Sequence, residues 1–280
     1  KSKEVRHIYR TTNIVIKPNS KLSSYCDQMC SEAKLFKNTV IFRCRQLLSA
    51  NRKGYTGLQN NEKEVLDEFK LTEGIFKKID FKYYLPGYVH FDYLFKVTKN
   101  PDYYNQLPMQ SNQQIIKEVL ADFKSYFKGC MAYKKNPESF IGKPKLPGYC
   151  KSEQISFDIT NQDCVIKTSK EGYPYLKLPK TKLTVNLGKL KPGRLKEVTI
   201  KPYYDTYKIC IVSEEPDMES IDLDYEKHLS LDLGIDNFAA SGNDCGLAPF
   251  IIKGNKIKAY NQWFNKKNAY LRSQLPKGQY

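Results

Sequence analysis

Apolar and polar positions change their spacing along the chain, and the changes divide it into regions. Residues 7–17 are rich in β-branched and aromatic side chains and stop at Pro18, which is typical of one strand followed by a turn. From residue 22 to residue 48, apolar positions recur every three or four residues without Gly or Pro. That spacing predicts one long amphipathic helix, or two joined closely. Further helical patterns span residues 62–79 and 111–131, with Ser111 as the expected cap of the latter.

The pattern changes after residue 136 to short stretches of alternating apolar residues separated by Gly and Pro. The six stretches are residues 155–159, 164–168, 175–178, 183–187, 195–203 and 207–213. Strands this short and regularly spaced predict a small antiparallel barrel. The N-terminal strand has no other sheet to join, so we expect it to complete this barrel, with the helical block inserted into it. The acidic residues 214–219 are expected to form the linker to the last region.

The last region begins with an aspartate inside an apolar run. Asp232 lies in a stretch that otherwise predicts a buried strand, Gly234 permits a bend, and a second short strand follows. Residues 249–254 predict a third strand and residues 257–272 a helix. Burial of a lone carboxylate costs several kcal/mol, which a bound divalent metal would offset. The alternative is a turn or capping residue that accepts backbone N–H bonds.

Asp236 is a weaker metal candidate than Asp232. Along an extended strand the two residues would lie about 13 Å apart, too far to hold one ion. Asp236 is therefore interpreted as a turn residue in the hairpin.

The net charge of the chain indicates the class of molecule that it binds. The 280 residues contain 46 Lys and Arg against 30 Asp and Glu, a net charge of +16, which favours polyanions. Lysines alternate with aromatic residues, as in residues 76–84, so phosphates and unpaired bases are candidate ligands. For any single ring, an ordinary place in the core is the competing interpretation. The candidate phosphate contacts in the barrel loops are Lys143, Lys145, Lys189, Lys191 and Arg194, and the alternative is a solvated basic loop.

The eight cysteines form no Cys-x-x-Cys pair and are interpreted as reduced thiols. Cys26 and Cys30 are four residues apart in a predicted helix, where buried packing is favoured over a metal site. The sequence shows no apolar run long enough to span a membrane and no apolar signal-peptide core at its start. We therefore expect no membrane partner and a cytoplasmic, nucleoid-associated protein in a bacterium.

Three segments, in this order, resemble the TnpB family, the OrfB-type proteins of bacterial insertion sequences that are related to type V CRISPR effectors. The phrase LDLGIDNFAAS, followed by PFIIKGNKIKAYNQWFNKKNAYLRSQ, resembles the family's first RuvC motif and the following helix. LPMQSNQQIIKEVLADFKSYFKG resembles the helix before its β-barrel, and AKLFKNTVIFRCRQ resembles its first long helix.

The resemblance implies a multidomain α+β fold. An OB-like antiparallel wedge barrel (residues 1–20 and 137–222) would be interrupted by a helical recognition lobe (residues 21–136). The opening strands and helix of an RNase H-like RuvC nuclease domain (residues 223–280) would follow. Family members bind a transposon-encoded guide RNA and cut single- and double-stranded DNA targets in association with transposition and DNA recombination.

By the same resemblance, Asp232 matches the first acidic residue of a Mg²⁺ site. The family's later glutamate and aspartate and its zinc-binding insertion are not among these 280 residues, so the Mg²⁺ site would be incomplete and zinc is expected only beyond them. We expect the chain to bind nucleic acid without cutting it, and the last region to be poorly stable without a partner. The chain is then either part of an RNA-guided endonuclease or a naturally truncated, non-cutting regulator. A basic protein that binds RNA but has no DNA target is a third reading.

Overall fold

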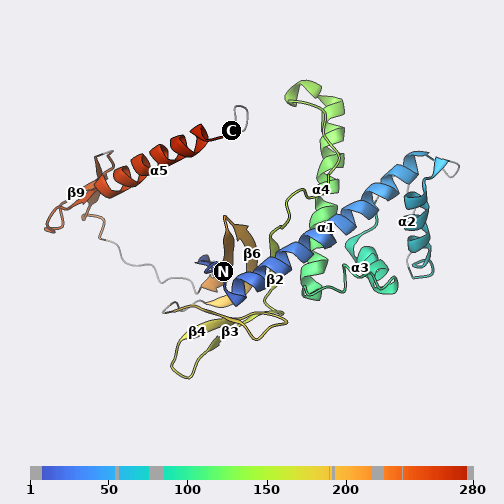
Figure 1. Ribbon diagram of the computed structural model, residues 1–280, viewed down its shortest axis with the longest axis horizontal. Coiled ribbons are helices and arrows are strands. Elements are labelled where there is room, and N and C mark those ends of the chain that lie inside the picture. Colours follow the sequence, from blue (N-terminus) through green and yellow to red (C-terminus); the bar gives the residue numbers. More distant parts are fainter. Residues whose placement is uncertain are drawn as a thin grey trace, which may run out of the picture. The chain divides into compact units, whose positions relative to one another are not determined.

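The chain divides into two compact units in a computed structural model, residues Lys1–Asp217 and Met218–Tyr280 (Figure 1). The structure describes residues 8–53, 57–75, 85–188, 190, 193–215, 224–234 and 236–275. Each unit has its own sheet and helix arrangement, and each is described separately below. None of the described helices is long and apolar enough to cross a bilayer.

Helices dominate the chain between the first strand and the second. They are α1 (Lys21–Lys53), α2 (Asn60–Lys70), α3 (Tyr88–Val97), α4 (Met109–Lys135) and the short 3₁₀ helix η2 (Pro137–Ser139). The helices predicted over residues 22–48 and 111–131 are confirmed as α1 and α4. The helix predicted over residues 62–79 ends at Lys70, and residues 76–79 lie outside the described residues.

The start of α4 differs from the prediction. Ser111 is not the capping residue, because Pro108 holds that place and Ser111 lies within the first turn. Its hydroxyl instead donates a 2.6 Å hydrogen bond to the carbonyl oxygen of Asp158. Ser111 therefore ties α4 to the sheet, and a local capping pattern gave no sign of that long-range partner.

The larger sheet of the first unit has four antiparallel strands in the order β1-β7-β6-β2. Its strands are β1 (Ile8–Val15), β7 (Thr206–Glu215), β6 (Arg194–Tyr203) and β2 (Phe157–Thr160). The N-terminal strand pairs along its whole length with β7, from Ile8 opposite Glu215 to Val15 opposite Lys208. The expected partnership between the first strand and the strands after the helical block is therefore present.

The described strands do not form the predicted closed barrel. Strands β3 (Val165–Thr168), β4 (Pro174–Lys177) and β5 (Thr184–Asn186) form a separate three-stranded sheet in the order β3-β4-β5. These strands have three or four residues each, and each pairs with the strand that comes before or after it in the sequence. Among the described residues, β1 and β2 are therefore the two edge strands of the larger sheet. In a closed barrel each edge strand would be paired with a further strand.

Helix α1 organises the core of the first unit. It packs against α2 and α4 and lies against β6 and β7 (Figure 1). Its Phe36 is fully buried, with its ring 5.2 Å from that of Phe95 and 5.5 Å from that of Tyr103. Phe95 and Tyr103 stack at 5.6 Å, so an aromatic cluster joins α1 to α3 and the loop that follows it.

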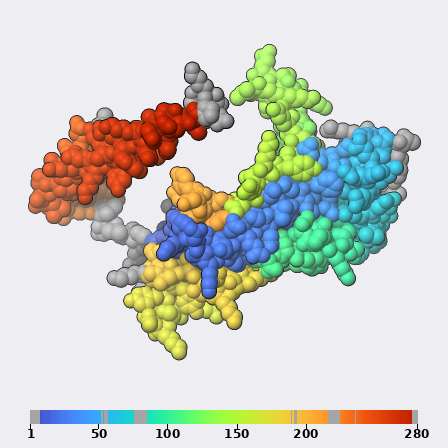
Figure 2. Space-filling model, in the orientation of Figure 1, coloured from blue at the N-terminus to red at the C-terminus, as the bar shows by residue number. Residues whose placement is uncertain are grey.

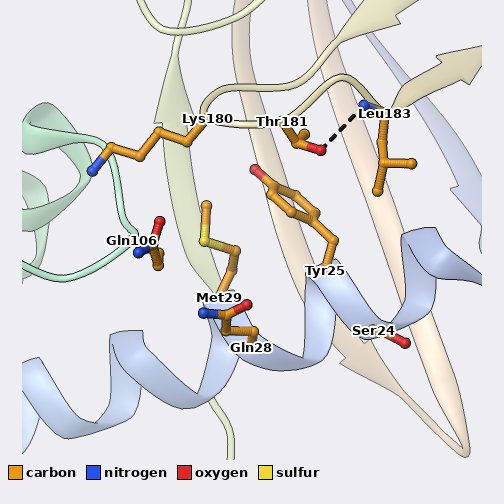
Figure 3. A pocket seen from close by; sticks show the side chains of 8 residues that line it. All are labelled: Ser24, Tyr25, Gln28, Met29, Gln106, Lys180, Thr181 and Leu183. Carbon is orange, nitrogen blue, oxygen red and sulfur yellow. Dashed lines mark hydrogen bonds between the residues drawn. The ribbon is translucent and has the colours of Figure 1, made fainter.

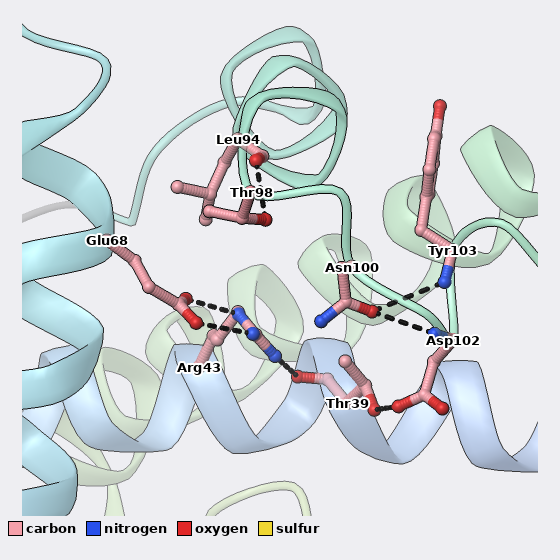
Figure 4. A network of polar contacts seen from close by, with 8 residues as sticks. All are labelled: Thr39, Arg43, Glu68, Leu94, Thr98, Asn100, Asp102 and Tyr103. Carbon is pink, nitrogen blue, oxygen red and sulfur yellow. Dashed lines mark hydrogen bonds and ion pairs between the residues drawn. The ribbon is translucent and has the colours of Figure 1, made fainter.

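A polar network crosses the same region (Figure 4). Two nitrogens of the Arg43 guanidinium in α1 donate to the Glu68 carboxylate of α2 at 2.7 Å, a two-point ion pair that is largely buried. The Arg43 guanidinium also lies 5.1 Å from the centre of the Phe95 ring. Thr39, one turn earlier in α1, donates to the Asp102 carboxylate. These contacts fix α2 and the loop after α3 against α1.

The second unit consists of three antiparallel strands and a helix. The strands β8 (Leu229–Asp232), β9 (Asn237–Asn243) and β10 (Ile251–Lys253) lie in the order β10-β9-β8, and α5 (Asn255–Ser273) follows. The predicted succession of three strands and one helix is therefore confirmed. The RNase H-like assignment of this unit stays a prediction.

Candidate nucleic-acid interface

Asp232 is the last residue of β8 and lies opposite Ala240 of β9. All four residues of β8 are exposed, and the Asp232 side chain is among them. The predicted burial of this carboxylate in an apolar strand is therefore wrong for this chain. The apolar run does form a strand, but nothing in the described part of the chain covers either of its faces.

The neighbouring carboxylates have partners of their own. Asp236 forms an ion pair with Lys258 at the start of α5, and that hydrogen bond lowers the pKa of the Asp236 carboxyl. Asp244 accepts hydrogen bonds from the backbone N–H of His228 at 2.6 Å and from its ring at 2.8 Å, which lowers its pKa as well. These contacts join the ends of the strands and the helix, so both carboxylates have structural roles.

No metal centre follows from these positions. Across the described ranges, no three His, Cys, Asp or Glu side chains gather as metal ligands. A two-metal hydrolytic site needs several carboxylates around its ions, and Asp232 is a single exposed one. The described residues do not fit Mg²⁺, and no hydrolytic step can be derived from them.

Lys143 and Lys145 lie in the segment between η2 and β2, and both are exposed. The segment is fastened to α1 a few residues later. Arg45 donates to the carbonyl oxygen of Pro147 at 2.7 Å, and Asn38 accepts from the backbone N–H of Cys150 at 2.8 Å. The two lysines therefore project from a segment whose path is fixed, which suits a phosphate contact.

Arg194 has a different setting. It opens β6 and is exposed, but its partner across the ladder is Glu214. Glu215 is close as well, because its carboxylate accepts from the backbone N–H of Gly193 at 3.1 Å. Glu214 also forms an ion pair with Lys196 at 2.6 Å, so Arg194 lies in a cluster of mixed charge at the end of the sheet. Lys189 and Lys191 lie outside the described residues.

Cys26 and Cys30 of α1 form neither a metal site nor a nucleophile among the described residues. Cys26 and Cys30 are fully buried in the core, as expected for packing residues, and burial raises the pKa of the Cys26 thiol to about 12. A thiol with that pKa stays protonated at neutral pH and is a poor nucleophile or metal ligand.

A cavity of about 270 Å³ lies between α1 and two loops of the first unit (Figure 3). The described residues that line it are Ser24, Tyr25, Gln28, Met29, Gln106, Lys180, Thr181 and Leu183. The Tyr25 hydroxyl donates to the carbonyl of Pro179 at 3.0 Å, and the Lys180 ammonium donates to the carbonyls of Asn105 and Leu107 at 3.1 and 2.8 Å. This lining contains no carboxylate, imidazole or thiol; Tyr25 ties one loop to α1, and Lys180 ties the two loops to each other.

Sequence reasoning predicted the strands β6 and β7, which lie in the first unit (Figure 2), but not the exposed side chains at the turn between them. Tyr203 and Tyr204 lie at its turn, and Lys201 and Lys208 face each other just before it. The signal was readable in part, because a Tyr-Tyr-Asp-Thr run separates two stretches of alternating residues. The exposure of Tyr204 and Lys201 was not readable from the sequence, since it depends on the register of the strands.

Comparison with known proteins gives a likeness in structure but none in sequence. No protein-family model matches the sequence, and no curated protein matches it significantly. Among solved structures, the chain is similar to a protein in the cryo-EM structure of the Cas12f1-sgRNA-target DNA complex, at 12% sequence identity and a TM-score of 0.27. The likeness covers 95% of this chain and 62% of that protein's length. The two chains thus align over much of their length without superposing closely.

Proposed function

We propose that this chain binds a guide RNA and, together with it, DNA complementary to that RNA. The observation that carries the proposal is the ordered resemblance of three segments to the TnpB family. Those segments fall on α1, on α4 and on the β8–β9 hairpin with α5. Transposon origin is part of the same proposal, because it rests on the same resemblance.

The charge of the chain supports a nucleic-acid partner independently of that resemblance. A net charge of +16 on 280 residues draws a polyanion to the surface, and each phosphate that is neutralised releases condensed counterions. Exposed lysines on fixed segments, such as Lys143 and Lys145, are suited to this role. Binding should therefore weaken steeply as salt is raised.

Binding without cleavage is the second part of the proposal. These residues supply one candidate metal carboxylate, Asp232, and it is exposed. Incubation of the chain with its RNA, Mg²⁺ and complementary DNA should leave the DNA intact. Cut DNA that disappears in the Asp232→Asn variant would overturn this part and leave the binding proposal standing.

Recovery of RNA from the purified chain tests the binding proposal. Expressed with its native flanking DNA and purified at low salt, the chain should retain a discrete RNA that sequencing identifies. Recovery of only mixed cellular RNA, with no enrichment, would contradict a guide-dependent function and favour a general RNA-binding protein.

The two lysines supply a finer test. Replacing Lys143 and Lys145 together by Ala should reduce the slope of log affinity against log salt by about 2, roughly 1 for each phosphate that is no longer neutralised. Lys227→Ala is the matched control, because that exposed lysine is already paired with Asp224 at 2.9 Å. An unchanged slope in the double variant would remove these two residues from the interface.

A further inference from the structure

The turn of the β6–β7 hairpin carries an aromatic side chain that neither the turn nor the core requires. Tyr203 pairs with Thr206, which leaves Tyr204 and Asp205 as the two loop residues. Tyr204 has a φ of 52°, in the left-handed region that favours Gly, Asn and Asp. Its side chain is 89% exposed, so it gains nothing from burial. A strained position that holds a bulky, exposed ring points to a ligand.

The rings at the turn are arranged as a platform. Tyr203 and Tyr204 meet edge to face with their centres 4.7 Å apart. The Lys208 ammonium lies 3.8 Å from the centre of the Tyr203 ring, which holds that ring in place from the strand opposite. Tyr203 therefore supports Tyr204 from one side, and the rest of the Tyr204 ring is open to solvent.

Positive charge gathers beside the platform. Lys201 and Lys208 are directly opposite each other on β6 and β7, a like-charge pair that weakens a sheet. Lys17 is close as well, because Thr206 donates to the carbonyl of Ile16 and the Ile16 N–H donates to the carbonyl of Tyr207 at 2.8 Å. Within the described part of the chain none of these three lysines forms an ion pair, and Asp205 at the turn is the nearest acidic residue in sequence to Lys208.

We propose that the hairpin turn binds an unpaired nucleotide, with its base stacked on Tyr204 and its phosphate held by Lys201, Lys208 and Lys17. An aromatic face beside cations is the chemistry that binds single-stranded nucleic acid without sequence preference. A base inside a duplex is already stacked, so the turn selects unpaired segments or ends. This inference rests on the proposed function and adds a contact point to it. RNA and DNA share the chemistry, and the experiment separates them.

Tyr204→Asn is the informative variant, because Asn tolerates the positive φ and removes the ring. The probes are a single-stranded RNA and a single-stranded DNA of the same sequence, each with one 2-aminopurine, and the corresponding duplexes. Tyr204→Phe keeps the ring. Tyr225→Asn is the matched control, since Tyr225 is 83% exposed in the second unit. Circular dichroism melting checks that each variant is folded.

The wild type and Tyr204→Phe should bind the single strand and quench its 2-aminopurine fluorescence. Tyr204→Asn should bind about tenfold more weakly and lose the quenching, with duplex affinity unchanged. A larger loss for the RNA strand would assign the site to RNA, and a larger loss for the DNA strand to DNA. If the wild type binds single strands and Tyr204→Asn binds them equally well, the stacking site is wrong and the proposed function survives. If the wild type binds neither nucleic acid, both proposals fail.

Discussion

The two units of the chain contain similar patterns of apolar residues, but these side chains are buried in the first unit and largely exposed in the second. In the first unit Phe36, Phe91 and Phe95 are fully buried where helices meet. In the second, Leu231 is 52% exposed and Trp263 is 61% exposed, although both lie in well-formed elements. Among the described residues of the second unit, Ala239 is the buried apolar side chain. An apolar pattern therefore predicts a strand or helix, but burial depends on whether another element covers it.

The difference in burial between the two units also affects how much each contributes to stability. Burial of apolar surface is the main favourable term in folding, so the first unit contains the residues that stabilise the fold. The second unit presents apolar side chains on α5 and on its sheet, a surface typical of interaction sites. Substitutions at buried and at exposed positions test the comparison.

The largest effect is expected in the aromatic core. Phe36→Ala should lower the free energy of unfolding by about 4 kcal/mol, because it removes a fully buried ring that contacts Phe95 and Tyr103. Phe264→Ala, in the exposed α5, should change it by less than about 0.5 kcal/mol. Urea denaturation followed by circular dichroism measures both. Equal losses would show that the second unit has a core of its own.

The buried ion pair should come next. Glu68→Ala leaves the Arg43 guanidinium buried without its carboxylate and should cost about 3 kcal/mol. Asp67→Ala breaks the exposed ion pair with Lys70 in the same helix and should cost less than about 1 kcal/mol. A loss for Glu68→Ala as small as that for Asp67→Ala would mean that water reaches Arg43.

Ionised Glu62 makes a smaller contribution to the free energy of unfolding, and this contribution depends on pH. Hydrogen bonds from Lys53, from Ser49 and from the backbone of Gln59 lower its pKa from 4.5 to about 2. The folded-state pKa lies below the unfolded one, so ionised Glu62 stabilises the protein above pH 4.5 and this contribution is lost as pH falls toward 2. The stability difference between wild type and Glu62→Gln should therefore be largest at neutral pH and shrink on acidification. A difference that stays constant with pH would contradict the shift.

The smallest effect is expected at Asp232. Because its side chain is exposed, Asp232→Asn should change the free energy of unfolding by less than about 0.5 kcal/mol. A gain of more than about 1 kcal/mol would indicate that the carboxylate is buried after all, since neutralising a buried, unpaired charge is stabilising.

Local pattern was sufficient for much of the fold. The periodicity of residues 22–48 and the alternation of residues 195–203 and 207–213 predicted α1, β6 and β7 within a few residues. Helix α3 was missed, because it has only ten residues and is held by packing of Phe95 on Phe36 of α1 and of Phe91 on Phe69 of α2. The predictions of a closed barrel and of a buried Asp232 were wrong for a related reason, since both features depend on contacts between segments far apart in the sequence.

The candidate site divides in the same way. The exposure of Lys143 and Lys145 could be predicted from the sequence, because exposure of loop lysines is the usual outcome, and their contact with phosphates stays a prediction. Tyr204 could not be identified as a candidate site residue from the sequence, since its positive φ and its place beside Lys208 follow from the register of β6 against β7.

DNA binding in the presence and absence of RNA tests the central claim most directly. Fluorescence anisotropy would follow a labelled DNA that is complementary to the RNA recovered with the chain, against a scrambled DNA of equal length. We expect tight binding only when the chain, its RNA and the complementary DNA are all present. Equal affinity for complementary and scrambled DNA, with or without RNA, would contradict RNA-guided binding and leave a basic protein that binds nucleic acid by charge alone.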